Sequence, residues 1–86
     1  MEPETVEVEV LFFARARELA GRASARIRLP AGSSVESAAR RIGEEFPGLG
    51  PYLRSCRLAL DEAFASGGEE VRDRSVLAVI PPVSGG

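Results

Sequence analysis

The stretch that most constrains the fold lies at the C-terminal end of the chain and reads Val76-Leu77-Ala78-Val79-Ile80-Pro81-Pro82-Val83-Ser84-Gly85-Gly86. Its first five residues are all apolar, which predicts a central β-strand covered on both faces. Two prolines follow, and because proline lacks the backbone N–H that a sheet needs, the strand should end at Ile80. The sequence therefore predicts a core strand that runs directly into a short tail at residues 81–86.

The tail at residues 81–86 has the composition of an extended arm. The two prolines restrict the segment next to the strand, which lowers the entropy cost of docking it onto another protein. Gly85 and Gly86 have no Cβ and can pass through a channel too narrow for other residues. We therefore expect a flexible functional tail whose working group is the C-terminal carboxylate of Gly86. A frayed terminus is the alternative, because chain ends are commonly disordered.

Two alternating segments near the N-terminus predict a β-hairpin. Residues 6–10 alternate Val with Glu, which is typical of a half-buried strand. Continuing the period places Phe12 on the inner face and both Leu11 and Phe13 on the opposite face. Residues 23–29 alternate in the same way, so the two segments should pair as antiparallel strands.

The middle of the chain predicts one main helix followed by short strands. Ser33 followed by Glu36 forms a capping box, and Pro47-Gly48 supplies the stop. The apolar face of this helix consists of Val35, Ala38, Ala39, Ile42 and Phe46. Residues 57–60 and 63–64 then read as strands. One helix packed across a mixed sheet of four to five strands is an α+β fold of the β-grasp, ubiquitin-like type.

Composition limits what the chain can do alone. Its 86 residues suffice for one domain, residues 1–86, and a net charge of −2 gives no basis for nucleic-acid binding. No apolar stretch is long enough to span a membrane and no secretion leader is evident, so we expect a cytoplasmic protein that does not bind membranes. The chain has no His and no Lys, and therefore lacks common general bases and metal ligands. We expect no metal site and no catalysis by this chain alone.

Smaller features allow both functional and structural interpretations. Cys56 is the single cysteine and could relay sulfur, but a cysteine beside a strand is more often a small core residue. Arg15, Arg17 and Arg22 cluster near the short helix expected at residues 14–20 and could bind phosphate. Ordinary surface arginines, or a contact with an acidic partner, are the alternatives.

Three blocks of the sequence resemble the MoaD family, the small sulfur-carrying subunit of molybdopterin synthase within the ThiS-like, ubiquitin-like superfamily. They are residues 10–21 (VLFFARARELAG), the helix that follows Ser33-Ser34-Val35, and residues 76–86. The Pro-Pro-Val-Ser-Gly-Gly ending is the most specific block. Two turns depart from the family pattern: Asp61 stands where Asn is common, and residues 72–75 replace a turn that often contains Gly-Asp.

The resemblance implies a sulfur carrier in molybdenum cofactor biosynthesis. An E1-like (MoeB-like) adenylating enzyme would use ATP to activate the carboxylate, and a sulfur donor would convert it to a thiocarboxylate. The tail would then enter a MoaE-like large subunit, which transfers the sulfur to a pterin precursor, and no cofactor would stay bound to the carrier. The implied site comprises Gly86 as the reactive group, a partner-binding tail of Gly85, Ser84, Val83, Pro82, Pro81 and Ile80, and a docking surface at Val79 and Phe13.

Three other roles are compatible with the same ending. Sulfur carriers for tRNA thiolation or thiamin synthesis use the same activation, although the Pro-Pro-Val-Ser and Phe-Phe-Ala sequences favour the molybdopterin branch. A ubiquitin-like modifier would be joined through Gly86 to lysines of target proteins. An interaction domain with an inert tail is the third possibility.

Overall fold

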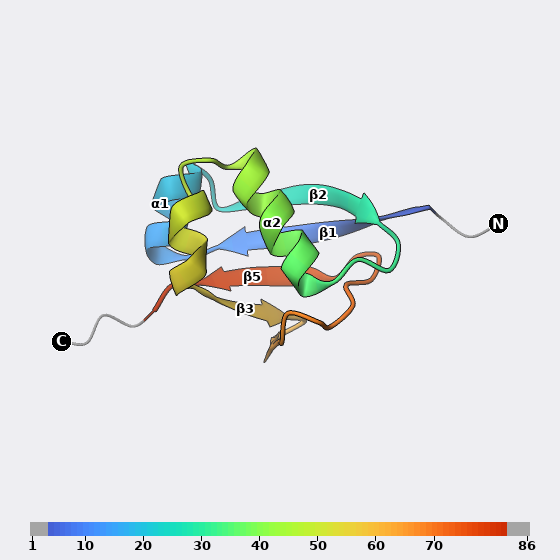
Figure 1. The fold of residues 1–86 in the computed structure, drawn as a ribbon. Helices are drawn as coiled ribbons and strands as arrows, with labels where there is room; N and C mark the ends of the chain where they lie inside the picture. Colours follow the sequence, from blue (N-terminus) through green and yellow to red (C-terminus); the bar gives the residue numbers. More distant parts are fainter. Residues whose placement is uncertain (1–3, 83–86) are drawn as a thin grey trace.

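The computed structural model describes residues 4–82. Its elements, in chain order, are β1 (Thr5–Phe12), α1 (Ala14–Ala20), β2 (Ser24–Pro30), α2 (Val35–Glu45), the 3-10 helix η1 (Gly50–Ser55), β3 (Arg57–Leu60), β4 (Ala63–Phe64) and β5 (Val76–Ile80). The strands form one mixed sheet, and α2 and η1 lie across one of its faces (Figure 1). This arrangement confirms the predicted β-grasp fold.

The sheet has the strand order β2-β1-β5-β3-β4. β1 and β2 form the predicted antiparallel hairpin, with Val8 opposite Ile27. β5 lies between β1 and β3, parallel to the first and antiparallel to the second, so the last strand is central as predicted. Because β5 is held on both edges, the point where the chain leaves the sheet after Ile80 is fixed by two neighbouring strands.

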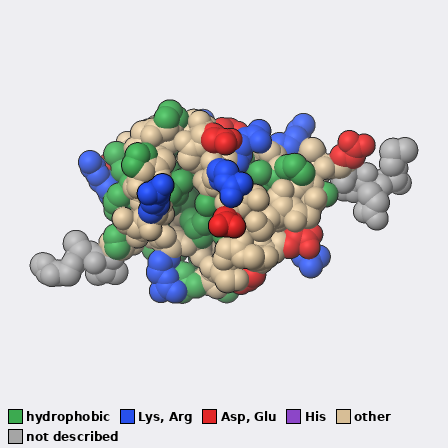
Figure 2. Space-filling view, in the orientation of Figure 1, with side chains coloured by type: hydrophobic (Ala, Val, Ile, Leu, Met, Phe, Trp, Pro, Cys, Tyr) green, Lys and Arg blue, Asp and Glu red, His purple; other side chains and the backbone are tan. Residues whose placement is uncertain are grey.

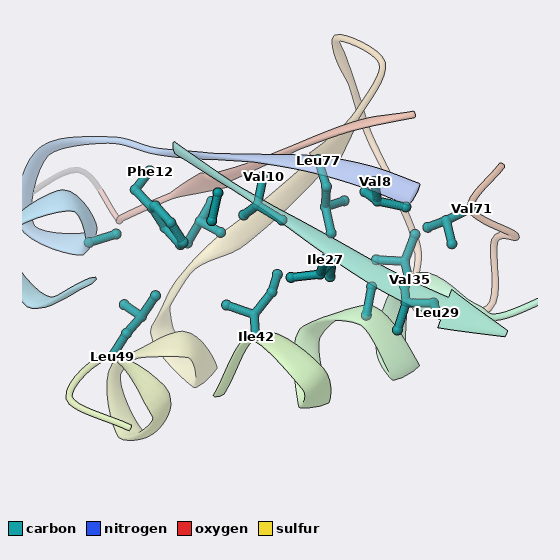
Figure 3. Close-up of a cluster of buried hydrophobic side chains, with 14 of the residues drawn as sticks. Val8, Val10, Phe12, Ile27, Leu29, Val35, Ile42, Leu49, Val71 and Leu77 are labelled. Carbon is teal, nitrogen blue, oxygen red and sulfur yellow. The ribbon is translucent and has the colours of Figure 1, made fainter. Parts of the chain in front are cut away.

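The core lies between the sheet and the helices. Figure 3 shows Ile42 pointing from α2 toward the sheet, close to Ile27 of β2. At one end of the core the rings of Phe12 and Phe46 meet edge to face, with 5.1 Å between centroids. The side chains buried from water on this face include Val8, Val10, Val35, Leu49, Val71, Leu77 and Val79. Alternation in β1 and β5 therefore sends every second residue into this core.

The prediction that β5 is covered on both faces is wrong. Leu77 and Val79 are fully buried on the helix side, but Val76, Ala78 and Ile80 point to the other face and are only half-buried. The physical reason is that α2 and η1 pack on the same side of the sheet (Figure 1), which leaves the apolar side chains on the other face without a covering layer.

The start of α2 also differs from the prediction. The N-cap is Ser34, whose Oγ accepts a hydrogen bond from the Ser37 amide at 3.1 Å. The expected cap, Ser33, instead donates its hydroxyl to the Pro30 carbonyl at 2.6 Å, and its own carbonyl accepts from the Val71 amide at 2.9 Å. Ser33 is thus held in the preceding turn, and the helix begins one residue later.

α2 and η1 pack side by side at Gly43 and Gly50, where an added Cβ would make ordinary van der Waals contacts. A Cβ added at Gly50 would lie 3.4 Å from the Gly43 carbonyl oxygen, and one added at Gly43 would lie 3.6 Å from the Gly50 Cα. On the outside of α2, Arg41 and Glu45 form an i,i+4 ion pair at 2.8 Å. Figure 2 looks onto this helix-covered face, where charged side chains of both signs surround scattered apolar ones.

Candidate functional site

The candidate site is an apolar groove on the uncovered face of the sheet. Its floor comes from the outward residues of the central strands, Val76, Ala78 and Ile80 of β5, and from Leu11 of β1. Its complete lining is Leu11, Phe13, Ala59, Asp61, Glu62, Phe64, Val76, Ala78 and Ile80. The groove extends along β5 and reaches Ile80, the residue from which the tail departs.

Two aromatic rings flank the groove and are the large apolar side chains exposed within residues 4–82. Phe13 is 48% exposed at the end of β1, and Phe64 is 56% exposed on the short edge strand β4. Ala59 of β3 pairs with Phe64 and, being small, leaves the space between the ring and β5 open. Contiguous exposed apolar surface of this kind usually marks a site of interaction.

An acidic turn closes the end of the groove that is distant from the tail. Asp61 and Glu62 have φ values of 48° and 75°, as the central residues of a type I′ hairpin turn require. Asp61 forms two hydrogen bonds with Val76 at the start of β5. Its amide donates to the Val76 carbonyl at 2.8 Å, and its Oδ1 accepts from the Val76 amide at 2.8 Å. Asp therefore fulfils here the turn role for which Asn is also suited.

A basic side chain lies beside the groove, at its β3–β4 edge, where it also lines the neighbouring hollow next to α2 and η1. The guanidinium carbon of Arg57 lies 3.8 Å from the centroid of the Phe64 ring, which is a cation–π contact. The register of β3 on β5 places Arg57 directly opposite Ile80. Beyond Ile80, Pro81 is half-buried and Pro82 is exposed. The predicted tail residues Val83, Ser84, Gly85 and Gly86 lie outside the described part of the chain.

The two predicted docking residues lie on opposite faces of the sheet. Phe13 is on the groove, as the alternation in β1 predicts. Val79 is fully buried in the core, so its assignment to a docking surface is wrong: its neighbour Ile80 is the residue that faces outward. The sequence reasoning missed Val76, Ala78 and Phe64. Alternation within β5 could have indicated the first two, since one face of an apolar strand must point away from the helix layer.

Cys56 does not have the surroundings of a sulfur relay. It is half-buried after η1, and its Sγ–H donates to the Tyr52 carbonyl at 3.5 Å. Burial raises the pKa of this thiol, which keeps it protonated and weakly nucleophilic at neutral pH. The structural interpretation of Cys56 as a packed side chain is thereby favoured.

Of the three arginines near α1, Arg17 and Arg22 line one hollow together with Glu18. Arg15 pairs with Glu18 at 2.8 Å, and the Arg22 Nε donates to the Ser24 carbonyl at 2.7 Å. Within residues 4–82, no group of three or more Cys, Asp or Glu side chains is arranged to hold a metal ion. None of the helices in this range is sufficiently long and apolar to cross a membrane.

Comparisons with known proteins show which family and which structures the chain resembles. Residues 10–86 match the ThiS family. The chain is 42% identical to the molybdopterin synthase sulfur carrier subunit of Arabidopsis thaliana, over 95% of this chain and 85% of the relative. Among solved structures it resembles a putative molybdopterin converting factor subunit 1 from Pyrococcus furiosus, with a TM-score of 0.82, 31% identity, and coverage of 91% of this chain and 99% of the other. It also resembles a chain of the complex of subunits 1 and 2 of molybdopterin-converting factor from Helicobacter pylori, with a TM-score of 0.65, 28% identity, and coverage of 94% and 100%.

Proposed function

The chain belongs to the ThiS family, and we propose that it is the sulfur carrier subunit of molybdopterin synthesis, which delivers sulfur from its C-terminal tail to a larger partner subunit. The observation that carries this proposal is the position of the apolar groove, which reaches the residue from which the tail leaves the sheet. A partner that covers the groove receives the tail at a defined place on its own surface.

The groove supplies the binding energy that the tail alone lacks. Complete burial of a Phe or Ile side chain contributes about 1.5–3 kcal/mol, and the groove presents several apolar side chains that are only partly buried. The large subunit is the partner that this surface suits, since a structural neighbour is a complex of molybdopterin-converting factor subunits 1 and 2. Docking on rigid strands would also hold the tail close to the reacting groups of the partner, and reactants held together in this way react faster.

The reactive group in this proposal is the carboxylate of Gly86. A carboxylate is a poor acyl donor because it carries a negative charge and has no good leaving group. A separate E1-like enzyme would join it to AMP from ATP, releasing pyrophosphate, and a sulfur donor would then displace AMP to leave a thiocarboxylate. The activating enzyme supplies the catalysis, because this chain contains no His or Lys to serve as a base.

The narrow tail has a physical role in this scheme. Gly85 and Gly86 add the least possible bulk beside the reacting carbonyl, and Pro81 and Pro82 keep the segment next to β5 extended. Carriers for other pathways and protein modifiers would use the same carboxylate. The molybdopterin role is preferred because the similarity to the Arabidopsis carrier extends over 95% of this chain.

Reconstitution with the large subunit and the pterin precursor tests the proposal. The thiocarboxylated chain should support formation of molybdopterin, whereas a chain lacking Gly86 should support none and should remain folded. A chain lacking Glu2 is the matched control, because it is shortened by one residue at the opposite terminus and should stay active. Product formation by the chain without Gly86 would overturn the proposal.

A further inference from the structure

Arg57 is an exposed cation that a neighbouring ring holds in place. Its guanidinium stacks on the Phe64 ring at 3.8 Å, although both residues are exposed to solvent. Within residues 4–82 the ion pairs join Arg15 to Glu18 and Arg41 to Glu45, so no described carboxylate neutralises Arg57. A stacked guanidinium keeps its in-plane N–H groups available for a bidentate acceptor.

The position of Arg57 connects it to both the groove and the tail. It lies opposite Ile80 in the sheet, and the ring beneath its guanidinium lines the groove. The other end of the groove carries the carboxylates of Asp61 and Glu62. The docking face is therefore apolar along β5 and acidic at the end distant from the tail, and Arg57 adds a positive charge at its β3–β4 edge, from a backbone position opposite Ile80.

We propose that Arg57 is a specificity-determining contact of the docking face and binds a carboxylate on the surface of the partner subunit, beside the opening that admits the tail. This inference rests on the proposed function, because it needs a partner that covers the groove. Such a partner displaces water from Phe64 and from the guanidinium stacked on it. A partner surface without a carboxylate would leave that charge desolvated and unpaired, which disfavours binding.

The opposite charges of Arg57 and of the acidic turn also set the direction of docking. A partner turned end for end would bring its acidic group against Asp61 and Glu62, where like charges repel. Arg57 thus favours the orientation in which the opening of the partner faces the tail and not the hairpin turn. The contrasting possibility is that Arg57 only shields the Phe64 ring from water, in which case its charge contributes nothing to binding.

Calorimetric titration of the carrier with the large subunit of the same organism, at low and at high ionic strength, tests the inference. Arg57→Gln should raise the Kd by about tenfold or more at low ionic strength and should reduce the salt dependence. Arg57→Glu should raise the Kd further, because it faces the partner carboxylate with a like charge. The matched control is Arg28→Gln, which removes the same charge from the outer face of β2, away from the groove, and should leave the Kd unchanged.

The possible outcomes separate this inference from the proposed function. If Arg57→Gln and Arg57→Glu bind as the wild type does while Phe13→Ala binds more weakly, the groove is the docking face and the role of Arg57 is refuted. If the wild-type chain does not bind the large subunit at all, the proposed function fails and this inference fails with it. Thermal unfolding of each variant shows whether a change in Kd reflects lost contact or lost structure.

Discussion

Replacing Phe13 with alanine should weaken binding to the large subunit without much effect on folding. Complete burial of a Phe side chain contributes about 1.5–3 kcal/mol, and Phe13 is 48% exposed, so docking should gain about 1 kcal/mol from the remaining half. Since about 1.4 kcal/mol corresponds to a tenfold change, the Kd should rise about fivefold. The backbone role of Phe13 is unaffected, because its carbonyl still accepts from the Ala16 amide at the start of α1.

Val79→Ala is the matched comparison, since Val79 lies on the same end of the sheet but on the buried face. It should lower the free energy of unfolding by about 2 kcal/mol through lost burial and a cavity, and should leave the Kd of the folded protein unchanged. Calorimetric titration gives the Kd, and chemical denaturation gives the stability. Wild-type binding by Phe13→Ala, or binding by folded Val79→Ala that is as weak as that of Phe13→Ala, would show that Phe13 does not contact the partner from the groove.

Three further predictions concern the scaffold. Gly43→Ala should raise the free energy of unfolding by up to about 1 kcal/mol in chemical denaturation, because alanine favours the helix more than glycine does. The added methyl would make contacts of 3.5 Å or longer, so there is room for it; a loss of stability would show that α2 and η1 cannot accommodate it. Asp61→Ala should lower the free energy of unfolding in the same assay by about 1–2 kcal/mol, because it removes the acceptor for the Val76 amide at a residue with positive φ. Asp61→Asn keeps an acceptor oxygen and should change stability little; equal losses in the two variants would contradict this role of the Asp61 side chain. Alkylation of Cys56 should reach its half-maximal rate at a higher pH than a small thiol, because the raised pKa keeps it protonated up to that pH; an equal or lower midpoint would contradict this.

The sequence was sufficient for the fold because its strongest signals are local. Strict alternation in residues 6–10 assigns an inner and an outer face to β1, and Pro81 fixes the end of β5. The start of α2 was misplaced because Ser33 and Ser34 are equally able to cap a helix. The choice between them depends on contacts distant in sequence, including the bond from the Val71 amide to the Ser33 carbonyl.

The candidate site was predicted only in part, for a related reason. An apolar run such as β5 indicates a central strand but does not reveal whether helices cover one face or both. Val79 and Ile80 are equally apolar, and only the direction of their side chains separates a core residue from a groove residue. The stacking of Arg57 on Phe64 depends on the β3–β4 turn, which brings together two side chains seven residues apart. No local pattern encodes that contact.

The intact mass of the chain recovered from its native host, with fragmentation to locate any change, tests the central claim most directly. The sulfur-carrier account predicts a gain equal to the replacement of one oxygen by sulfur, localised to Gly86. An unmodified terminus together with conjugates through Gly86 to lysines of other proteins would contradict the account in favour of a modifier. The absence of any modified form in cells that are actively making the molybdenum cofactor would contradict it in favour of an inert tail.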